Sequence, residues 1–118
     1  MGIDQVAEIS PIVREVLEAP SDGMCATFEI VGSPHAWAQV MKGTINAAYP
    51  LETAPESHLL EVLTCLPRSA VTAWEAKKFV TLTFESTNPS DVAKAVDRLF
   101  EKFFDVGDYS VDCRVEDL

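Results

Sequence analysis

Residues 70–85 read AVTAWEAKKFVTLTFE, and they predict two antiparallel β-strands joined by a turn. Residues 70–74 and 79–84 are rich in β-branched and aromatic side chains, which favour strands. Residues 75–78 form the predicted turn, although they lack the Asn-Gly or Asp-Gly pair that is typical of two-residue hairpin loops. We therefore place a β-hairpin at the centre of the fold.

A helix and a strand are predicted after the hairpin. Asn88 is positioned to cap a helix that begins at Pro89, and apolar residues recur at helical spacing from Val92 to Phe103. The chain then alternates between apolar and polar residues from Tyr109 onward, which predicts a strand with one buried face. The apolar set is Tyr109, Val111, Cys113 and Val115.

Before the hairpin, residues 24–31 alternate in the same way and predict another strand. Ser33 and Pro34 are typical of a helix start, and a helix to about Ala48 is predicted from apolar residues at helical spacing: Trp37, Val40, Met41 and Ile45. Residues 50–66 fit either a helix or a strand, and we favour a helix. Residues 1–20 predict an N-terminal extension with a short helix that begins at Ser10-Pro11.

This order of elements predicts an α+β fold of the ferredoxin-like type. In the βαββαβ order, two helices cover one face of a four-stranded antiparallel sheet. We expect a single domain over residues 1–118, with the βαββαβ core at 24–115 and the N-terminal helical extension at 1–20. The other face of the sheet would be open and polar. By alternation it would carry Thr27, Glu29, Thr81, Thr83, Glu85, Ser110, Asp112 and Arg114.

Charge and composition exclude some classes of function. The chain has 19 Asp and Glu residues against 9 Lys and Arg residues, a formal net charge of −10. Affinity for nucleic acid or an anionic membrane rests on basic side chains, so we expect neither as a partner. No apolar run is long enough to span a bilayer, and no signal peptide is visible. Together with three widely spaced cysteines, these features predict a cytoplasmic protein.

No sequence motif indicates a catalytic, metal or cofactor site. The cysteines and histidines lack the Cys-x₂-Cys and His-x₃-His spacings of zinc sites, and no phosphate-binding glycine loop or nucleophile elbow is present. We therefore predict no metal, no cofactor and no enzymatic activity. An enzyme with a dispersed site stays open as an alternative, with His35 and His58 as its acid–base candidates. A thiol nucleophile at Cys25 would need His35 beside it.

Three short segments resemble the small bacterial YbeD-like proteins. They are Ala19-Pro20 before the first predicted strand, residues 28–32 (FEIVG) at its end, and residues 78–83 (KFVTLT) at the start of the third. Domains of that family are similar to the ACT ligand-sensing domains. The resemblance therefore implies a ferredoxin-like, non-enzymatic and regulatory domain, and it assigns no binding residue to this chain.

Trp74 and Trp37 are the clearest interaction candidates. We expect Trp37 in the core, as part of the predicted helix stripe. We expect Trp74 near the end of an edge hairpin, on the same strand face as Thr72, where it either packs in the core or stays exposed as an anchor for a partner. The predicted partner-binding residues are Trp74, Lys77, Lys78, Thr81 and Thr83. Our first hypothesis is a binding or regulatory module that acts through a homodimer, a protein partner or a small ligand on its open sheet face. The second is an acidic adaptor, inhibitor or chaperone that docks onto a basic protein. The third is the enzyme with a dispersed site.

Overall fold

The computed structural model describes residues 5–66, 68–104 and 109–117. The elements follow in the order α1 (Gln5–Glu18), β1 (Met24–Ile30), β2 (Ser33–Met41), β3 (Thr44–Ala48), the 3₁₀ helix η1 (Glu56–Leu59), α2 (Leu60–Cys65), β4 (Ala70–Glu75), β5 (Phe79–Thr83), α3 (Pro89–Phe104) and β6 (Val111–Asp117).

The strands form one six-stranded sheet in the order β4-β5-β3-β2-β1-β6, and neighbouring strands pair antiparallel. β6 pairs with β1 along the full length of both strands, from Met24 opposite Asp117 to Ile30 opposite Val111. The α+β class is thus confirmed. The predicted four-stranded βαββαβ sandwich with two helices is wrong, because the described residues form six strands and three α-helices.

The largest departure from the prediction lies at residues 33–48, which form the hairpin β2–β3 and not a helix. Ala38 pairs with Ala47, and Val40 pairs with Ile45. Gly43 makes the turn with φ +75°, a left-handed conformation that glycine adopts without steric cost. The spacing that suggested a helix arises because Trp37 and Met41 belong to one face of the sheet while Val40 and Ile45 belong to the other.

Other expectations are confirmed. Strands occur as predicted at β1, at the hairpin β4–β5 and at β6. α3 begins as predicted, since Asn88 Oδ1 accepts a hydrogen bond from the Ser90 backbone N–H at 2.9 Å. The helix favoured within residues 50–66 is present as η1 and α2. The N-terminal helix starts earlier than expected, so that Pro11 lies inside α1 and does not begin it.

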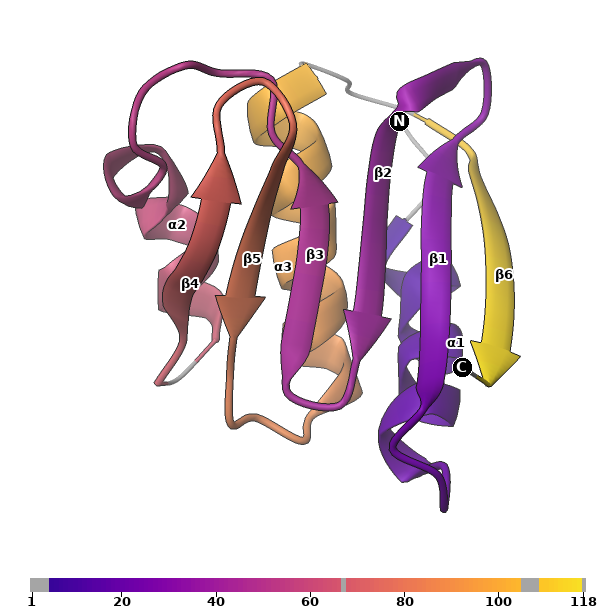
Figure 1. The fold of residues 1–118 in the computed structure, drawn as a ribbon. Helices are drawn as coiled ribbons and strands as arrows, with labels where there is room; N and C mark the ends of the chain where they lie inside the picture. Colours follow the sequence, from indigo (N-terminus) through magenta and orange to yellow (C-terminus); the bar gives the residue numbers. More distant parts are fainter. Residues whose placement is uncertain (1–4, 67, 105–108, 118) are drawn as a thin grey trace.

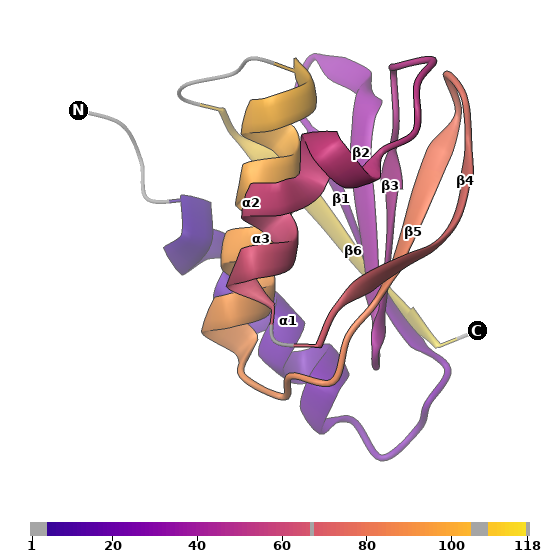
Figure 2. The same cartoon turned by 90° about the vertical axis from the view of Figure 1, so that its left-hand side faces the viewer.

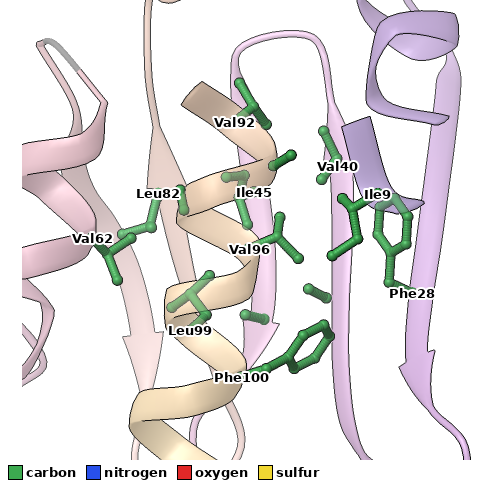
Figure 3. Packing of buried hydrophobic residues seen from close by; sticks show 14 of the residues in the cluster. Ile9, Phe28, Val40, Ile45, Val62, Leu82, Val92, Val96, Leu99 and Phe100 are labelled. Carbon is green, nitrogen blue, oxygen red and sulfur yellow. The ribbon is translucent and has the colours of Figure 1, made fainter. Parts of the chain in front are cut away.

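The three helices cover one face of the sheet (Figure 2). Figure 3 shows α3 over the centre of the sheet, with Val96 near Ile45. On either side of α3, Ile9 of α1 lies near Phe28, and Val62 of α2 faces Leu82. The labelled side chains are at most 1% exposed. α1, which the sequence suggested as an extension outside the βαββαβ core, therefore supplies part of the hydrophobic core.

Candidate functional site

The described helices leave one face of the sheet open (Figure 1). Because successive side chains of a strand point to opposite faces, alternate residues of each strand lie on this open face. In β2, Ala36, Ala38 and Val40 are fully buried on the helix side. The alternating residues Trp37 and Gln39 are half-buried and belong to the open face. The strand therefore presents an aromatic ring and an amide on the side that none of the described helices covers.

A row of paired residues crosses the open face from β6 to β4: Arg114, Thr27, Gln39, Asn46, Thr81 and Ala73. Within it, the Thr81 hydroxyl donates to Asn46 Oδ1 at 2.7 Å, and Gln39 Nε2 donates to Thr27 Oγ1 at 3.5 Å. The other amide atoms, Asn46 Nδ2 and Gln39 Oε1, make no hydrogen bond to the described part of the chain. One donor and one acceptor are thus available to a bound group.

Two aromatic residues lie beside this polar row. Trp37 of β2 pairs with Glu29 of β1, and Phe79 of β5 pairs with Ala48 of β3. Because β3 lies between β2 and β5, the two aromatic residues are separated by one strand.

The aromatic and amide side chains line a hollow of about 360 Å³, together with Lys78. We name the set Trp37, Gln39, Asn46, Phe79 and Thr81 the aromatic–amide patch. A second hollow of about 260 Å³ adjoins it, because Trp37 and Lys78 line both; its wall also includes His35 and Tyr49. The larger volume falls at the lower end of the ~300–1,000 Å³ range of small-molecule sites, and the smaller one lies below it.

Ion pairs compensate the charges around the hollow. Lys78 Nζ lies 3.2 Å from Glu75 Oε1, and Lys77 Nζ lies 2.8 Å from Glu52 Oε1. These side chains are all more than half exposed, so each pair contributes about 0–1 kcal/mol to stability. The basic residues of this region are thus already matched by carboxylates, and the hollow presents no excess positive charge to an anionic ligand.

The five residues predicted to bind a partner do not form one cluster. Thr81 and Thr83 lie on the open face, and Lys78 reaches the hollow beside Trp37. Lys77 occupies the β4–β5 turn with φ 59°, which explains how a turn without Asn-Gly is made.

Trp74 lies on the opposite face of the sheet from the patch. A β-bulge between Val71 and Ala73 shifts the alternation, so Trp74 pairs with the fully buried Val80 and shares the helix side with Val71, not with Thr72 as expected. Its ring meets that of Tyr49 edge-on at 6.0 Å, and the residue remains 38% exposed.

Sequence reasoning missed Trp37 as a surface residue, because it placed this residue in the buried stripe of a helix. The signal that would have found it is the alternation of Ala36, Ala38 and Val40, followed by a glycine at position 43. Among the predicted open-face residues, Thr27, Glu29, Asp112 and Arg114 do face that side, as their pairing with patch strands requires. Glu85 and Ser110 instead lie outside the ends of β5 and β6.

The described residues do not assemble a thiol–imidazole pair. Ala26 pairs with Val40 and Glu29 with Trp37, so Cys25 and His35 lie at opposite ends of the β1–β2 hairpin. Burial raises the pKa of the Cys25 thiol, which disfavours the nucleophilic thiolate. His58 Nε2 instead lies 3.0 Å from Thr53 Oγ1. Within the described ranges, no three His, Cys, Asp or Glu side chains are grouped to hold a metal ion.

A scan against protein-family models and searches of curated proteins and of solved structures found no match to this chain. The resemblance to YbeD-like proteins therefore stays a prediction, whereas the ferredoxin-like fold that it implied is wrong. In the part of the chain that the structure describes, no helix is long and apolar enough to cross a membrane.

Proposed function

We propose that this protein is a small, non-enzymatic binding or regulatory module that recognises its partner through the aromatic–amide patch. The observation that supports the proposal is the hollow between Trp37 and Phe79, with an amide donor and an amide acceptor beside it. Aromatic side chains supply contact area with little loss of conformational entropy, and adjacent polar groups fix orientation. A patch of this kind suits binding on a preformed surface.

The patch favours a flat, apolar group with hydrogen-bonding edges. Such a group stacks on Trp37 while its edge meets Asn46 Nδ2 or Gln39 Oε1. Such a group can belong to a free small molecule or to a side chain of a protein, including a second copy of this chain. A polyanion is disfavoured, because the chain carries −10 and the nearby lysines are ion-paired.

Thermal-shift assays with panels of amino acids, nucleosides and monosaccharides test the small-molecule source, and affinity capture with the purified chain as bait tests the protein source. We expect Trp37→Ala and Phe79→Ala to abolish the interaction that is found. Leu60→Ala is the matched control, because Leu60 is 65% exposed on α2, on the helix side of the sheet. A binder that is retained by both patch variants would refute the assignment. A chain that shows no thermal shift, captures nothing and has no self-association that depends on Trp37 or Phe79 would refute it as well.

The exposed acidic residues of β6 favour a second candidate function, an adaptor, inhibitor or chaperone that docks onto a basic protein. Asp112, Glu116 and Asp117 are exposed along this edge strand, and Asp112 pairs with Glu29. Attraction between exposed charges is screened over about 8 Å at 0.15 M salt, so capture of such a partner should fall steeply as salt rises above that level. Captured partners that are neutral and insensitive to salt would contradict this candidate.

We further propose a cytoplasmic location. The support is that Cys25, Cys65 and Cys113 are all free thiols, the state that a reducing compartment maintains. Imaging of the chain carrying a fluorescent tag tests this, and accumulation in an oxidising compartment would contradict it.

A further inference from the structure

The two edge strands of the sheet differ in their protection against pairing with another chain. Edge strands expose unpaired N–H and C=O groups, and proteins commonly guard them with charged side chains. β6 carries charges at Asp112, Arg114, Glu116 and Asp117. β4 has no charged residue from Ala70 to Trp74, and its only charge is at its last residue, Glu75. The charged side chains that protect the edge of β6 are therefore nearly absent from β4.

β4 is accessible along its free edge. It is the terminal strand of the sheet and, among the described residues, pairs with β5 alone (Figure 1). Five of its six residues are exposed, and the sixth, Val71, is half-buried. Trp74 leaves 38% of its surface uncovered, although it already contacts Tyr49. An extended strand laid along this edge would pair the free backbone groups and cover the indole.

β4 is also complementary to a second copy of itself. In an antiparallel pair about a twofold axis, directly opposite residues must point to the same face of the sheet. Val71 and Trp74 point to the helix side, and Ala70 and Glu75 point to the open side, as their partners in β5 show. A twofold pairing in which residue 70 lies opposite residue 75 and residue 71 lies opposite residue 74 meets this requirement. Each Trp74 then packs against Val71 of the other copy, a favourable aromatic and β-branched cross-strand pair.

The charges around β4 also permit self-association. The chain carries −10, so two copies repel each other at most surfaces. Around β4 each basic residue has its own acidic partner: Arg68 with Glu85, Lys77 with Glu52 and Lys78 with Glu75. Approach through β4 therefore brings together the least repulsive parts of the two chains.

We propose that two copies of this protein associate through antiparallel pairing of their β4 strands, which joins their sheets into one continuous sheet. The pairing leaves the aromatic–amide patch of each copy free, so it is independent of the proposed function. A strand of six residues with a β-bulge buries less than the ~1,200–2,000 Å² of a standard stable interface. The dimer is therefore weak, and it forms only at high protein concentration.

Sedimentation velocity from roughly 10 μM to 1 mM, the range in which weak complexes form, tests the proposal. The wild-type chain should shift from monomer to dimer. Ala73→Lys should stay monomeric, because position 73 lies beside the twofold axis and places two like charges close together. An equimolar mixture of Ala73→Lys and Ala73→Glu should associate again. Ala54→Lys, which adds the same charge at an exposed loop residue, should behave as the wild type.

Trp74 gives a second readout. In a Trp37→Phe background it is the single tryptophan, and its emission should shift to the blue with the same concentration dependence as the sedimentation. A wild-type chain that stays monomeric over the whole range would overturn the proposal. Dimerisation of Ala73→Lys at wild-type strength would do the same. Loss of the dimer in Trp37→Ala together with retention in Ala73→Lys would place the interface on the open face instead. Circular dichroism of each variant, and the mixing experiment, separate lost pairing from lost folding.

Discussion

Removing the hydroxyl group of Tyr109 tests how the segment before β6 is held to α3. Tyr109 is 6% exposed, and its hydroxyl donates to Asp97 Oδ1 at 2.6 Å. Its ring meets Phe100 at 5.4 Å, and its carbonyl oxygen accepts from Gln5 Nε2 at 2.8 Å. The Tyr109→Phe variant keeps the ring and the carbonyl contact and deletes the hydrogen bond alone.

The expected decrease in the free energy of unfolding follows from the chemistry of this hydrogen bond. A hydrogen bond to a charged group contributes about 1.5–3 kcal/mol. Asp97 is only half-buried, so water replaces part of the lost contact and the lower end of that range applies. We expect Tyr109→Phe to lower the free energy of unfolding by about 1.5 kcal/mol, which corresponds to a fall of roughly 5 °C in Tm for a chain of this size.

Urea unfolding followed by circular dichroism measures this change, and a double-mutant cycle with Asp97→Ala isolates the pair. We expect a coupling energy of about 1 kcal/mol or more between the two substitutions. Strictly additive effects would refute the reasoning, because they would show that the hydroxyl and the carboxylate do not depend on each other. A Tyr109→Phe variant with wild-type stability would refute it equally.

Three further outcomes are expected. Burial and the hydrogen bond to Asp97 raise the pKa of Tyr109 far above its ordinary value of 10.0. The contribution of the protonated hydroxyl to stability is therefore complete below about pH 10 and is lost as the pH rises further. In urea unfolding between about pH 8 and pH 11, Tyr109→Phe should lose less of its free energy of unfolding at alkaline pH than the wild type. Gly43→Ala should lower the free energy of unfolding by about 1–2 kcal/mol, because φ +75° disfavours a side chain, whereas Gly43→Asn should lower it less in the same chemical denaturation assay. Cys113 is exposed as a residue, but partial desolvation of its thiol and the nearby Glu8 carboxylate raise its pKa. Iodoacetamide at about pH 8 should therefore alkylate it more slowly than free cysteine, and a rate equal to that of free cysteine would contradict this.

Local sequence patterns predicted those elements whose signals do not depend on distant residues. Asn88-Pro89 marks the start of α3 because both the side-chain cap and the fixed φ of proline act within one turn. The strands β1, β5 and β6 alternate clearly between apolar and polar residues.

The hairpin β2–β3 escaped prediction for a physical reason. Its core face consists largely of alanines, which favour helices intrinsically and carry little hydrophobic signal. What buries Ala36, Ala38 and Ala47 is the close approach of the covering helices, which only the tertiary structure supplies. The pairing of β3 with β5 is equally non-local, because 30 or more residues separate Ala48 from its partner Phe79.

The candidate site was predicted only where it lies on the confirmed strands. Thr81 and Thr83 were assigned to the open face correctly, because β5 alternates without interruption. Trp37 was missed together with β2. Trp74 was placed on the same face as Thr72, which is wrong because a bulge changes the alternation by one residue. A bulge is set by the pairing partner, so the sequence of β4 alone does not reveal it.

The pairing of β6 with β1 also has a consequence for the nascent chain. During synthesis β1 leaves the ribosome many residues before β6, so its backbone edge stays unpaired while the rest of the sheet is being made. β1 holds a single charge, at Glu29, and such an edge is a template for aggregation. Once β6 docks, its acidic side chains become the outer border of the sheet. β6 thus protects the edge of β1 from pairing with other chains. A chain that ends before Val111 should aggregate during expression, although most of its core residues are present.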